Sequence, residues 1–91
     1  MTKEQIEKLC CFIEEYGRDK QVIKAVEECA ELQQRLCEAF TKRTKIELIA
    51  EEIADVTIML EQLKIIFDCS SDVEYWIENK IQRQIERMEN Q

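Results

Sequence analysis

Turn-forming residues are almost missing from this chain, which has one glycine and no proline among its 91 residues. In average proteins these two types together make up roughly 12% of the residues. Tight β-hairpins depend on Gly, Asn or Asp at positive φ, so an all-β fold would lack its turn chemistry. A glycine-rich phosphate-binding loop is excluded for the same reason. The sequence therefore predicts an all-α fold of long helices joined by short loops.

Four helical segments can be delimited by their capping residues. We expect helices at about residues 3–16, 20–40, 45–69 and 72–89, in a single domain. Three of them begin with capping-box spacing, a Thr or Ser three residues before a Gln or Glu: Thr2 with Gln5, Thr44 with Glu47, and Ser71 with Glu74. Gly17 ends the first helix, and Asp19 is placed to cap the second. Because short connections make successive helices antiparallel, we predict an antiparallel four-helix bundle.

Charge and the absence of histidine exclude several classes of function. The chain has 13 Lys and Arg residues against 20 Asp and Glu residues, a formal net charge of −7. Such a chain has no basic footprint for DNA or RNA, whose binding depends on neutralising phosphates. Without histidine there is no Ser-His-Asp or Cys-His triad and no His-containing zinc site. We therefore expect no nucleic acid polymer among the partners.

The targeting and cysteine patterns are typical of a cytoplasmic protein. No run approaches the roughly 18 apolar residues of a membrane span, and residues 1–5 lack the apolar stretch of a signal peptide. The five cysteines form no CxxC pair, which suits neither a disulfide framework nor a Cys-only zinc site. We expect reduced, buried thiols at Cys10, Cys11, Cys29, Cys37 and Cys69.

The segment at 45–69 is apolar on nearly all sides of a helical wheel. One side carries five large apolar residues: Ile46, Ile49, Ile53, Leu60 and Phe67. A second side carries four: Leu48, Met59, Leu63 and Ile66. A helix that is apolar all round is expected to be central and buried. Glu52 and Asp55 nevertheless fall inside the second side, where an unpaired buried ion costs several kcal/mol. Something must compensate for these two charges.

A matching acidic pair lies in the preceding helical segment, where Glu28 and Glu31 also share a face at i, i+3. At 1.5 Å per residue these two lie about 18 and 14 Å before the end of that segment. By the same rise, Asp55 and Glu52 lie about 15 and 11 Å after the start of the next one. In an antiparallel hairpin the four carboxylates therefore meet at one level. We expect no Lys or Arg of these two helices to face the cluster.

The repulsion among four converging carboxylates can be relieved in three ways. They can share protons, which raises their pKa values, or they can form salt bridges with the first or fourth helix. They can also bind a divalent cation, because all-oxygen ligands suit Mg²⁺, Mn²⁺ or Ca²⁺, and Mg²⁺ is often completed by substrate phosphates. The absence of His argues against a ferritin-like di-iron site. The simpler alternative is solvated surface charge, but the level positions across the hairpin favour a site.

The two acidic motifs together resemble a known signature. Glu27-Glu28-Cys29-Ala30-Glu31 followed by Glu52-Ile53-Ala54-Asp55 is similar to the EExxE…ExxD signature of the all-α nucleoside triphosphate pyrophosphohydrolases. Within that superfamily the chain looks most like the small MazG-like proteins of bacteria and their phages. The similarity covers about residues 22–87 and includes EECAEL at 27–32 and AEEIADVTIMLEQL at 50–63. It implies the MazG-like helical fold.

The resemblance implies Mg²⁺-dependent hydrolysis of a (deoxy)nucleoside triphosphate to the monophosphate and pyrophosphate, with Mn²⁺ as a substitute metal. It implies metal ligation by four residues: Glu28, Glu31, Glu52 and Asp55. Glu27 would be an accessory acid that orients the attacking water. The metal would bridge phosphate oxygens and lower the pKa of a bound water that attacks the α-phosphorus. Family members form dimers or tetramers, which agrees with the difficulty of covering an all-round apolar helix in a small chain.

The last helical segment carries an aromatic and basic stripe at i, i+4, i+7 and i+11: Trp76, Lys80, Arg83 and Arg87. The resemblance places Lys80 and Arg83 where the family has basic residues that meet the phosphates, and such cations stabilise charge on a leaving pyrophosphate. The alternative is an exposed strip that pairs with Glu78 or Glu86. Trp76 would stack on a base or, alternatively, pack against another helix.

These observations lead to one principal hypothesis and two alternatives. The principal hypothesis is a cytoplasmic enzyme of nucleotide-pool housekeeping that acts as a homodimer or homotetramer on a nucleoside triphosphate. One alternative is a non-catalytic helical interaction module whose apolar third helix is covered by a partner. The other is a degenerate homologue that binds metal or nucleotide without turnover. The chain lacks the insertions of the longer dUTP-hydrolysing relatives, so the resemblance implies no base preference.

Overall fold

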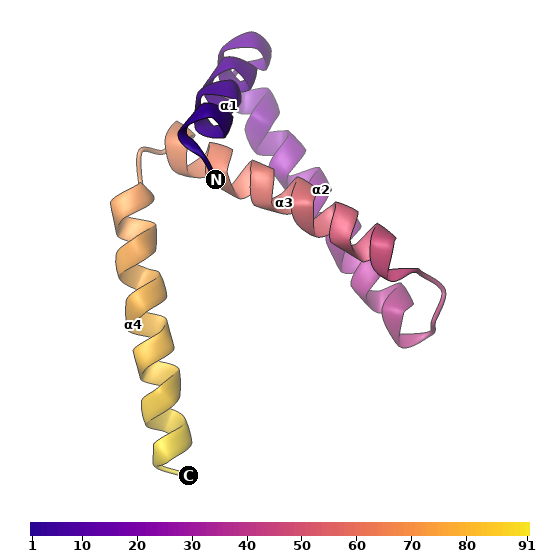
Figure 1. The fold of residues 1–91 in the computed structure, drawn as a ribbon, viewed down its shortest axis with the longest axis vertical. Helices are drawn as coiled ribbons and strands as arrows, with labels where there is room; N and C mark the ends of the chain where they lie inside the picture. Colours follow the sequence, from indigo (N-terminus) through magenta and orange to yellow (C-terminus); the bar gives the residue numbers. More distant parts are fainter.

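The computed structural model describes residues 1–91 and contains four α-helices and no strand (Figure 1). The helices are α1 (Lys3–Tyr16), α2 (Arg18–Phe40), α3 (Ile46–Ile66) and α4 (Ser70–Glu89). The all-α prediction is therefore confirmed, and each predicted helix is present with ends that lie within a few residues of the expected ones. None of the four helices combines the length and the apolarity needed to cross a membrane.

The first helix begins and ends as its sequence predicts. The Gln5 backbone N–H donates to Thr2 Oγ1 at 3.1 Å, and the Thr2 N–H donates back to Gln5 Oε1 at 2.9 Å. This reciprocal pair is a capping box and satisfies two of the donors at the helix start. Gly17 then interrupts the helix at φ 93°, a backbone angle that favours glycine.

The other three predicted caps are wrong. α2 begins at Arg18, directly after Gly17, so Asp19 lies inside its first turn. α3 begins after Lys45 and α4 after Cys69, and neither helix start receives a side-chain cap. Thr44 therefore lies one residue before the N-cap position, where its hydroxyl is buried without a hydrogen-bond partner.

The turns that precede α3 and α4 explain these shifted starts. Two non-glycine residues take up positive φ, Lys42 at 56° and Asp68 at 49°. The backbone N–H of the residue that follows each of these two donates a hydrogen bond to a carbonyl in the last turn of the preceding helix. Arg43 N–H donates to Glu38 O at 3.0 Å, and Cys69 N–H donates to Lys64 O at 3.0 Å. This arrangement is a Schellman motif, which usually uses glycine. In a chain with so little glycine, Lys and Asp occupy these positions instead.

The core lies where α1 crosses the open end of an antiparallel α2–α3 hairpin (Figure 1). Its buried apolar side chains are Leu9, Ala25, Val56, Met59 and Ile66. Two buried amides join α2 to α3, because Gln21 Nε2 donates to Gln62 Oε1 at 2.7 Å. A buried polar group is tolerated when it is hydrogen-bonded in this way. The predicted hairpin is therefore present and is held by a small mixed core.

α4 departs from the predicted bundle. It contacts only α3, next to the connecting turn, and then projects away from the other three helices (Figure 1). None of its residues is buried. The prediction that the third helix is buried on all sides is consequently wrong for the single chain, since Ile46 is 80% exposed and Phe67 60%. α1 and α2 cover one side of α3, and no helix of the chain covers the other.

The expectation of buried thiols also fails for three of the five cysteines. Cys10, Cys11 and Cys37 are exposed, whereas Cys29 and Cys69 are half-buried. The reason is the small core, because α1 buries Leu9 alone and α2 buries a narrow face.

Candidate metal centre

The hairpin brings acidic side chains of α2 and α3 together. One carboxylate oxygen from each of Glu28, Glu31 and Glu52 lies within 4.8 Å of the other two. α2 and α3 run in opposite directions, and at 1.5 Å per residue Glu28 and Glu31 lie about as far before the turn as Glu52 lies after it. The three residues are therefore at one level of the hairpin. Glu28 is buried, Glu52 is half-buried and Glu31 is exposed. The cluster is therefore open to solvent on the Glu31 side.

Asp55 completes the acidic group one helical turn after Glu52. Burial raises the pKa of Asp55 most, and the negative charge of Glu28 and a shared hydrogen bond with Glu28 raise this pKa further. Glu51 and Glu31 add smaller repulsions in the same direction. Asp55 thus lies beside Glu28, and ionising all these groups together is unfavourable.

Glu52 shows the same behaviour from the centre of the cluster. Loss of hydration raises the pKa of Glu52 first, followed by the charges of Glu31, Glu28 and Asp55. The positive charge of Arg35 lowers this pKa by a smaller amount. In both α3 carboxyls the proton-bound form is favoured relative to an ordinary Glu or Asp, first because burial disfavours the charged form and then because other negative charges lie nearby.

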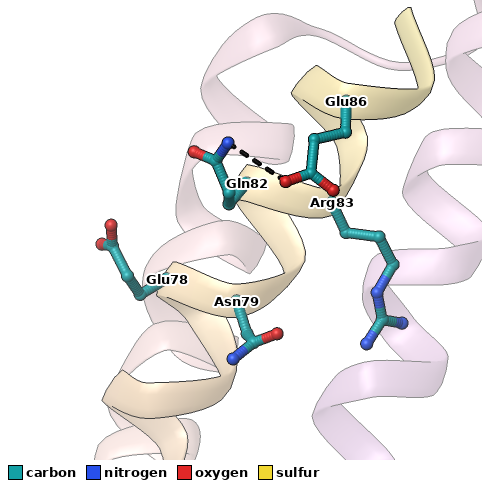
Figure 2. A pocket seen from close by; sticks show the side chains of 5 residues that line it. All are labelled: Glu78, Asn79, Gln82, Arg83 and Glu86. Carbon is teal, nitrogen blue, oxygen red and sulfur yellow. Dashed lines mark hydrogen bonds between the residues drawn. The ribbon is translucent and has the colours of Figure 1, made fainter. Parts of the chain in front are cut away.

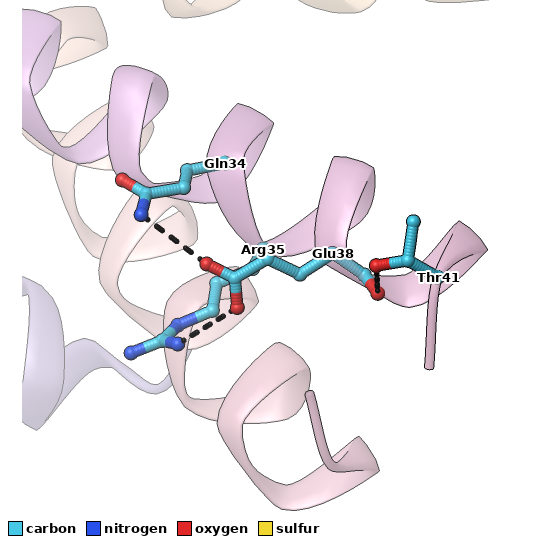
Figure 3. Close-up of polar contacts among 4 residues, drawn as sticks. All are labelled: Gln34, Arg35, Glu38 and Thr41. Atoms are coloured by element: carbon cyan, nitrogen blue, oxygen red, sulfur yellow. Dashed lines mark hydrogen bonds and ion pairs between the residues drawn. The ribbon is translucent and has the colours of Figure 1, made fainter. Parts of the chain in front are cut away.

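Two cations of α2 bracket the cluster, contrary to the expectation that none would face it. Lys24 Nζ lies 3.2 Å from Glu28 Oε1, and this contact, with the charge of Glu28, raises the pKa of Lys24. On the other side, Arg35 pairs with Glu38 at 3.3 Å, and the Glu38 carboxylate also accepts from Gln34 (Figure 3). Lys24 and Arg35 therefore compensate part of the negative charge, and Arg35 is shared with Glu38.

Two carboxylate oxygens remain uncompensated. Glu28 Oε2 and Glu52 Oε2 are both buried and have no hydrogen-bond partner. A buried acceptor without a partner is costly, and a buried anionic one more so. Both oxygens belong to residues of the cluster, so they are suited to accept a positively charged ligand there.

The donor set fits a hard divalent cation. All the ligand atoms on offer are carboxylate oxygens, the type preferred by Mg²⁺, Mn²⁺ and Ca²⁺. Two opposite ligands of Mg²⁺, at 2.0–2.1 Å from the ion, lie about 4.2 Å apart, and opposite ligands of Ca²⁺ about 5 Å. The ligand oxygens of the cluster lie within 4.8 Å of one another, so none of their separations exceeds the distance between opposite ligands of Ca²⁺. Glu28, Glu31 and Glu52 could therefore share one ion after small side-chain movements, with Asp55 adjacent.

The remaining residues singled out in the sequence do not join this cluster. Glu27 is exposed on α2 and lines a surface cavity together with Tyr16 and Lys24. Trp76, Lys80 and Arg83 lie on α4, which makes no contact with α2. The structure of one chain thus separates the acidic group from the basic stripe.

On α4 the basic stripe is exposed and only weakly engaged. Lys80 Nζ lies 5.9 Å from the centre of the Trp76 ring, and this ring stacks on Tyr75 at 5.3 Å. Arg83 forms no ion pair with Glu78 or Glu86, and Figure 2 shows its guanidinium extended away from the Gln82–Glu86 hydrogen bond. The alternative of an ion-paired strip is therefore not realised for Arg83, and the Trp76 side chain is 51% exposed.

Sequence reasoning missed the two bracketing cations, although a signal for them existed. Lys24 precedes Glu28 by four residues, and Arg35 follows Glu31 by four. Residues four apart share a helix face, so both cations belong to the same face of α2 as the acids.

A scan of protein-family models, a search of curated proteins and a search of solved structures each returned no match for this chain. The acidic motifs and the geometry of the cluster are therefore the features of this chain that bear on its function.

Proposed function

We propose that this chain is a Mg²⁺-dependent nucleoside triphosphate pyrophosphohydrolase with the MazG-like fold, acting in the cytoplasm as a homo-oligomer. In the proposed reaction, water attacks the α-phosphorus, the α–β phosphoanhydride bond breaks, and a nucleoside monophosphate and pyrophosphate are released. The observation that carries the proposal is the convergence of Glu28, Glu31 and Glu52 across the α2–α3 hairpin. The unpartnered buried oxygens of Glu28 and Glu52 support a cation at this point.

Each acidic residue has a role in this proposal. Glu28, Glu31, Glu52 and Asp55 hold the metal, and Glu27, which is exposed beside them on α2, orients the attacking water. Mg²⁺, or Mn²⁺ in its place, supplies charge neutralisation at the phosphates and a more acidic water. Lys24 holds Glu28 at 3.2 Å and limits the repulsion within the cluster when no metal is bound.

The basic residues of α4 complete the site only if they come from another chain. Lys80 and Arg83 would bind the phosphates, and Trp76 would stack on the base. Because α4 has no contact with α2 of its own chain, these side chains would reach the carboxylates of a second copy. This part of the proposal agrees with a homo-oligomeric enzyme whose nucleotide pocket lies near a subunit interface.

The decisive experiment measures pyrophosphate release from a panel of ribo- and deoxyribonucleoside triphosphates, with and without Mg²⁺. We expect Mg²⁺-dependent release by the wild-type chain, and at least a hundredfold loss in Glu31→Gln and in Asp55→Asn. Glu78→Gln, which removes the same charge from exposed α4, is the matched control and should retain activity. Circular dichroism checks that each variant is helical. Release that persists unchanged in both α2 and α3 variants would refute the site.

A second candidate function is a non-catalytic helical interaction module. It is favoured by the large apolar side chains that α3 and α4 expose, such as Phe67 at 60% and Met88 at 63%. The same assay separates the two functions. An interaction module would release no pyrophosphate from any triphosphate, with or without Mg²⁺.

A further inference from the structure

A cavity of about 280 Å³ opens where α1 ends and α2 begins. Its charged lining residues are Lys20, Lys24 and Glu27, and Tyr16, the last residue of α1, lines it as well. Two lysines against one glutamate give this lining a net charge of +1, although the whole chain carries a net charge of −7. The cavity is therefore suited to a small anion.

The cavity borders the candidate metal centre, because Lys24 belongs to both. The Lys24 ammonium group lies 3.2 Å from Glu28 Oε1, and Glu28 Oε2 is one of the two buried oxygens of the acidic cluster that have no hydrogen-bond partner. Glu27, which the proposed function assigns to the attacking water, also lines the cavity. An anion in the cavity would therefore lie beside residues that hold the metal and the water.

The positions of the two lysines along α2 favour an extended anion. Lys20, Lys24 and Glu28 follow one another at steps of four residues. Residues four apart share a helix face, and each step advances the helix by about 6 Å. A ligand that begins at a metal on Glu28 and continues along this face meets Lys24 first and Lys20 next. Such spacing suits a chain of linked phosphate groups, which carries negative charge along its length.

Lys20 is the cation of this group that has no partner. It takes part in none of the ion pairs of the chain, whereas Lys24 pairs with Glu28 and Arg35 pairs with Glu38. Like charges four residues apart on a helix repel each other, so Lys20 and Lys24 both gain from an anion that lies between them. When Glu28 is neutralised by a bound cation, the Lys24 ammonium group is free to contact the same anion.

The cations of α4 have no comparable place within the same chain. Arg83 lines a cavity together with Glu78 and Glu86, so that lining has a net negative charge, one arginine against two glutamates. α4 also makes no contact with α2. Lys20 and Lys24 are therefore the chain's own candidates for contacts with phosphate groups.

We propose that Lys20 and Lys24 bind the phosphate groups beyond the metal, so that the cavity receives the pyrophosphate part of a nucleoside triphosphate. Lysine ammonium groups bind phosphate as point charges, and the Tyr16 hydroxyl on the same cavity is a further hydrogen-bond donor. Both lysines would stabilise the negative charge that develops on the leaving pyrophosphate. The proposal rests on the proposed function and adds a phosphate subsite on α2, distinct from Lys80 and Arg83 of α4.

Isothermal titration calorimetry with inorganic pyrophosphate in excess Mg²⁺ tests this subsite without turnover. We expect Lys20→Gln to weaken pyrophosphate binding about fivefold, the effect of losing one exposed charge pair. Lys3→Gln removes the same charge at the far end of α1 and should bind pyrophosphate like the wild-type chain. Circular dichroism checks that both variants are helical. A wild-type chain that binds no pyrophosphate would overturn the proposal, as would wild-type affinity in Lys20→Gln or equal losses in the two variants.

Deoxynucleoside monophosphates, titrated in the same way, distinguish the two ends of the triphosphate. They carry only the α-phosphate, so Lys20→Gln should bind them as the wild-type chain does. A loss confined to the monophosphates would place the α-phosphate in the cavity and overturn the assignment. In the wild-type chain, Mg²⁺ and pyrophosphate together should shift the backbone amide resonances of Lys20 and Lys24, and unchanged resonances at both would contradict the subsite.

The failure of this subsite and the failure of the enzyme give different results. If the chain hydrolyses triphosphates while Lys20→Gln binds pyrophosphate normally, the proposed function stands and the subsite is wrong. If pyrophosphate binds through Lys20 and no triphosphate is hydrolysed, the subsite stands and the enzymatic proposal is wrong.

Discussion

Neutralising Asp55 should make the metal-free chain more stable and, at the same time, insensitive to Mg²⁺. The pKa of Asp55 is raised by burial and by Glu28, so its charged form is disfavoured in the folded state. Asp55→Asn keeps the shape of the side chain and removes this charge. A raised carboxyl pKa contributes stability below the unfolded pKa of about 3.9, and this contribution is lost as pH rises through the folded pKa. The benefit of the substitution should therefore appear at neutral pH and vanish near pH 4.

The magnitude is worked for one pair of carboxylates, because Asp55 adjoins Glu28, which belongs to the cluster whose oxygens lie within 4.8 Å of one another. Two unit charges about 5 Å apart repel by roughly 0.8 kcal/mol in water and roughly 3 kcal/mol at an effective dielectric constant of 20. Because Asp55 is partly exposed, solvent screening places the gain near the lower value, about 1 kcal/mol. In a domain of this size that corresponds to a rise in Tm of about 4–8 °C.

Mg²⁺ should make the wild-type chain more stable than Asp55→Asn, the reverse of the order expected without metal. A ligand present at 100 times its Kd stabilises the wild-type chain by about 2.7 kcal/mol, while the Asn variant lacks one of the four proposed ligands. Thermal unfolding followed by circular dichroism, with and without millimolar Mg²⁺, measures both effects. Glu78→Gln carries the same change in net charge and should follow the wild-type protein in both conditions. If Asp55→Asn lowers the Tm at pH 7 without metal, or gains as much from Mg²⁺ as wild type, the reasoning is refuted.

Two further substitutions test the cations and turns around the hairpin. Lys24→Met removes the ammonium group that lies 3.2 Å from Glu28. The metal-free chain should therefore become less stable, and the Mg²⁺-induced rise in Tm should become larger. A smaller rise would show that Lys24 supports metal binding instead of competing with the metal. Lys42→Gly places glycine at the positive φ of 56° and should stabilise the chain by about 1 kcal/mol in urea unfolding. Lys45→Gly, at φ −109°, should give no gain, and equal stabilisation of both variants would exclude backbone strain as the cause.

The sequence predicted what depends on local geometry. Helix periodicity and the shortage of glycine and proline gave the all-α class, and Gly17 together with the Thr2–Gln5 pair gave the bounds of α1. The approach of Glu28 and Glu31 to Glu52 followed from the rise per residue alone, because an antiparallel hairpin fixes which positions are level.

What the sequence did not predict depends on the turns and on the path of the chain after α3. Capping-box spacing is short and recurs by chance, so Thr44 and Ser71 matched the pattern although the Schellman turns moved the helix starts. The direction of α4 depends on the turn at Asp68. No local sequence pattern predicts the positive φ of this residue. The interpretation of α3 as a buried helix came from its composition, and composition alone does not tell whether the helices of the same chain cover each side.

Two features of α3 each cost free energy, and they lie on different sides of the helix. Towards α2, Glu52 and Asp55 are held where their charged forms are disfavoured. Away from α2, Leu60 and Phe67 are held in solvent. A chain of this size has only a few kcal/mol of net stability, so features that cost free energy persist when a ligand compensates for them. A divalent cation is the compensation that the carboxylates of the first side are suited to bind, so the metal-free chain should be less stable than the Mg²⁺-bound chain if the proposed site is correct.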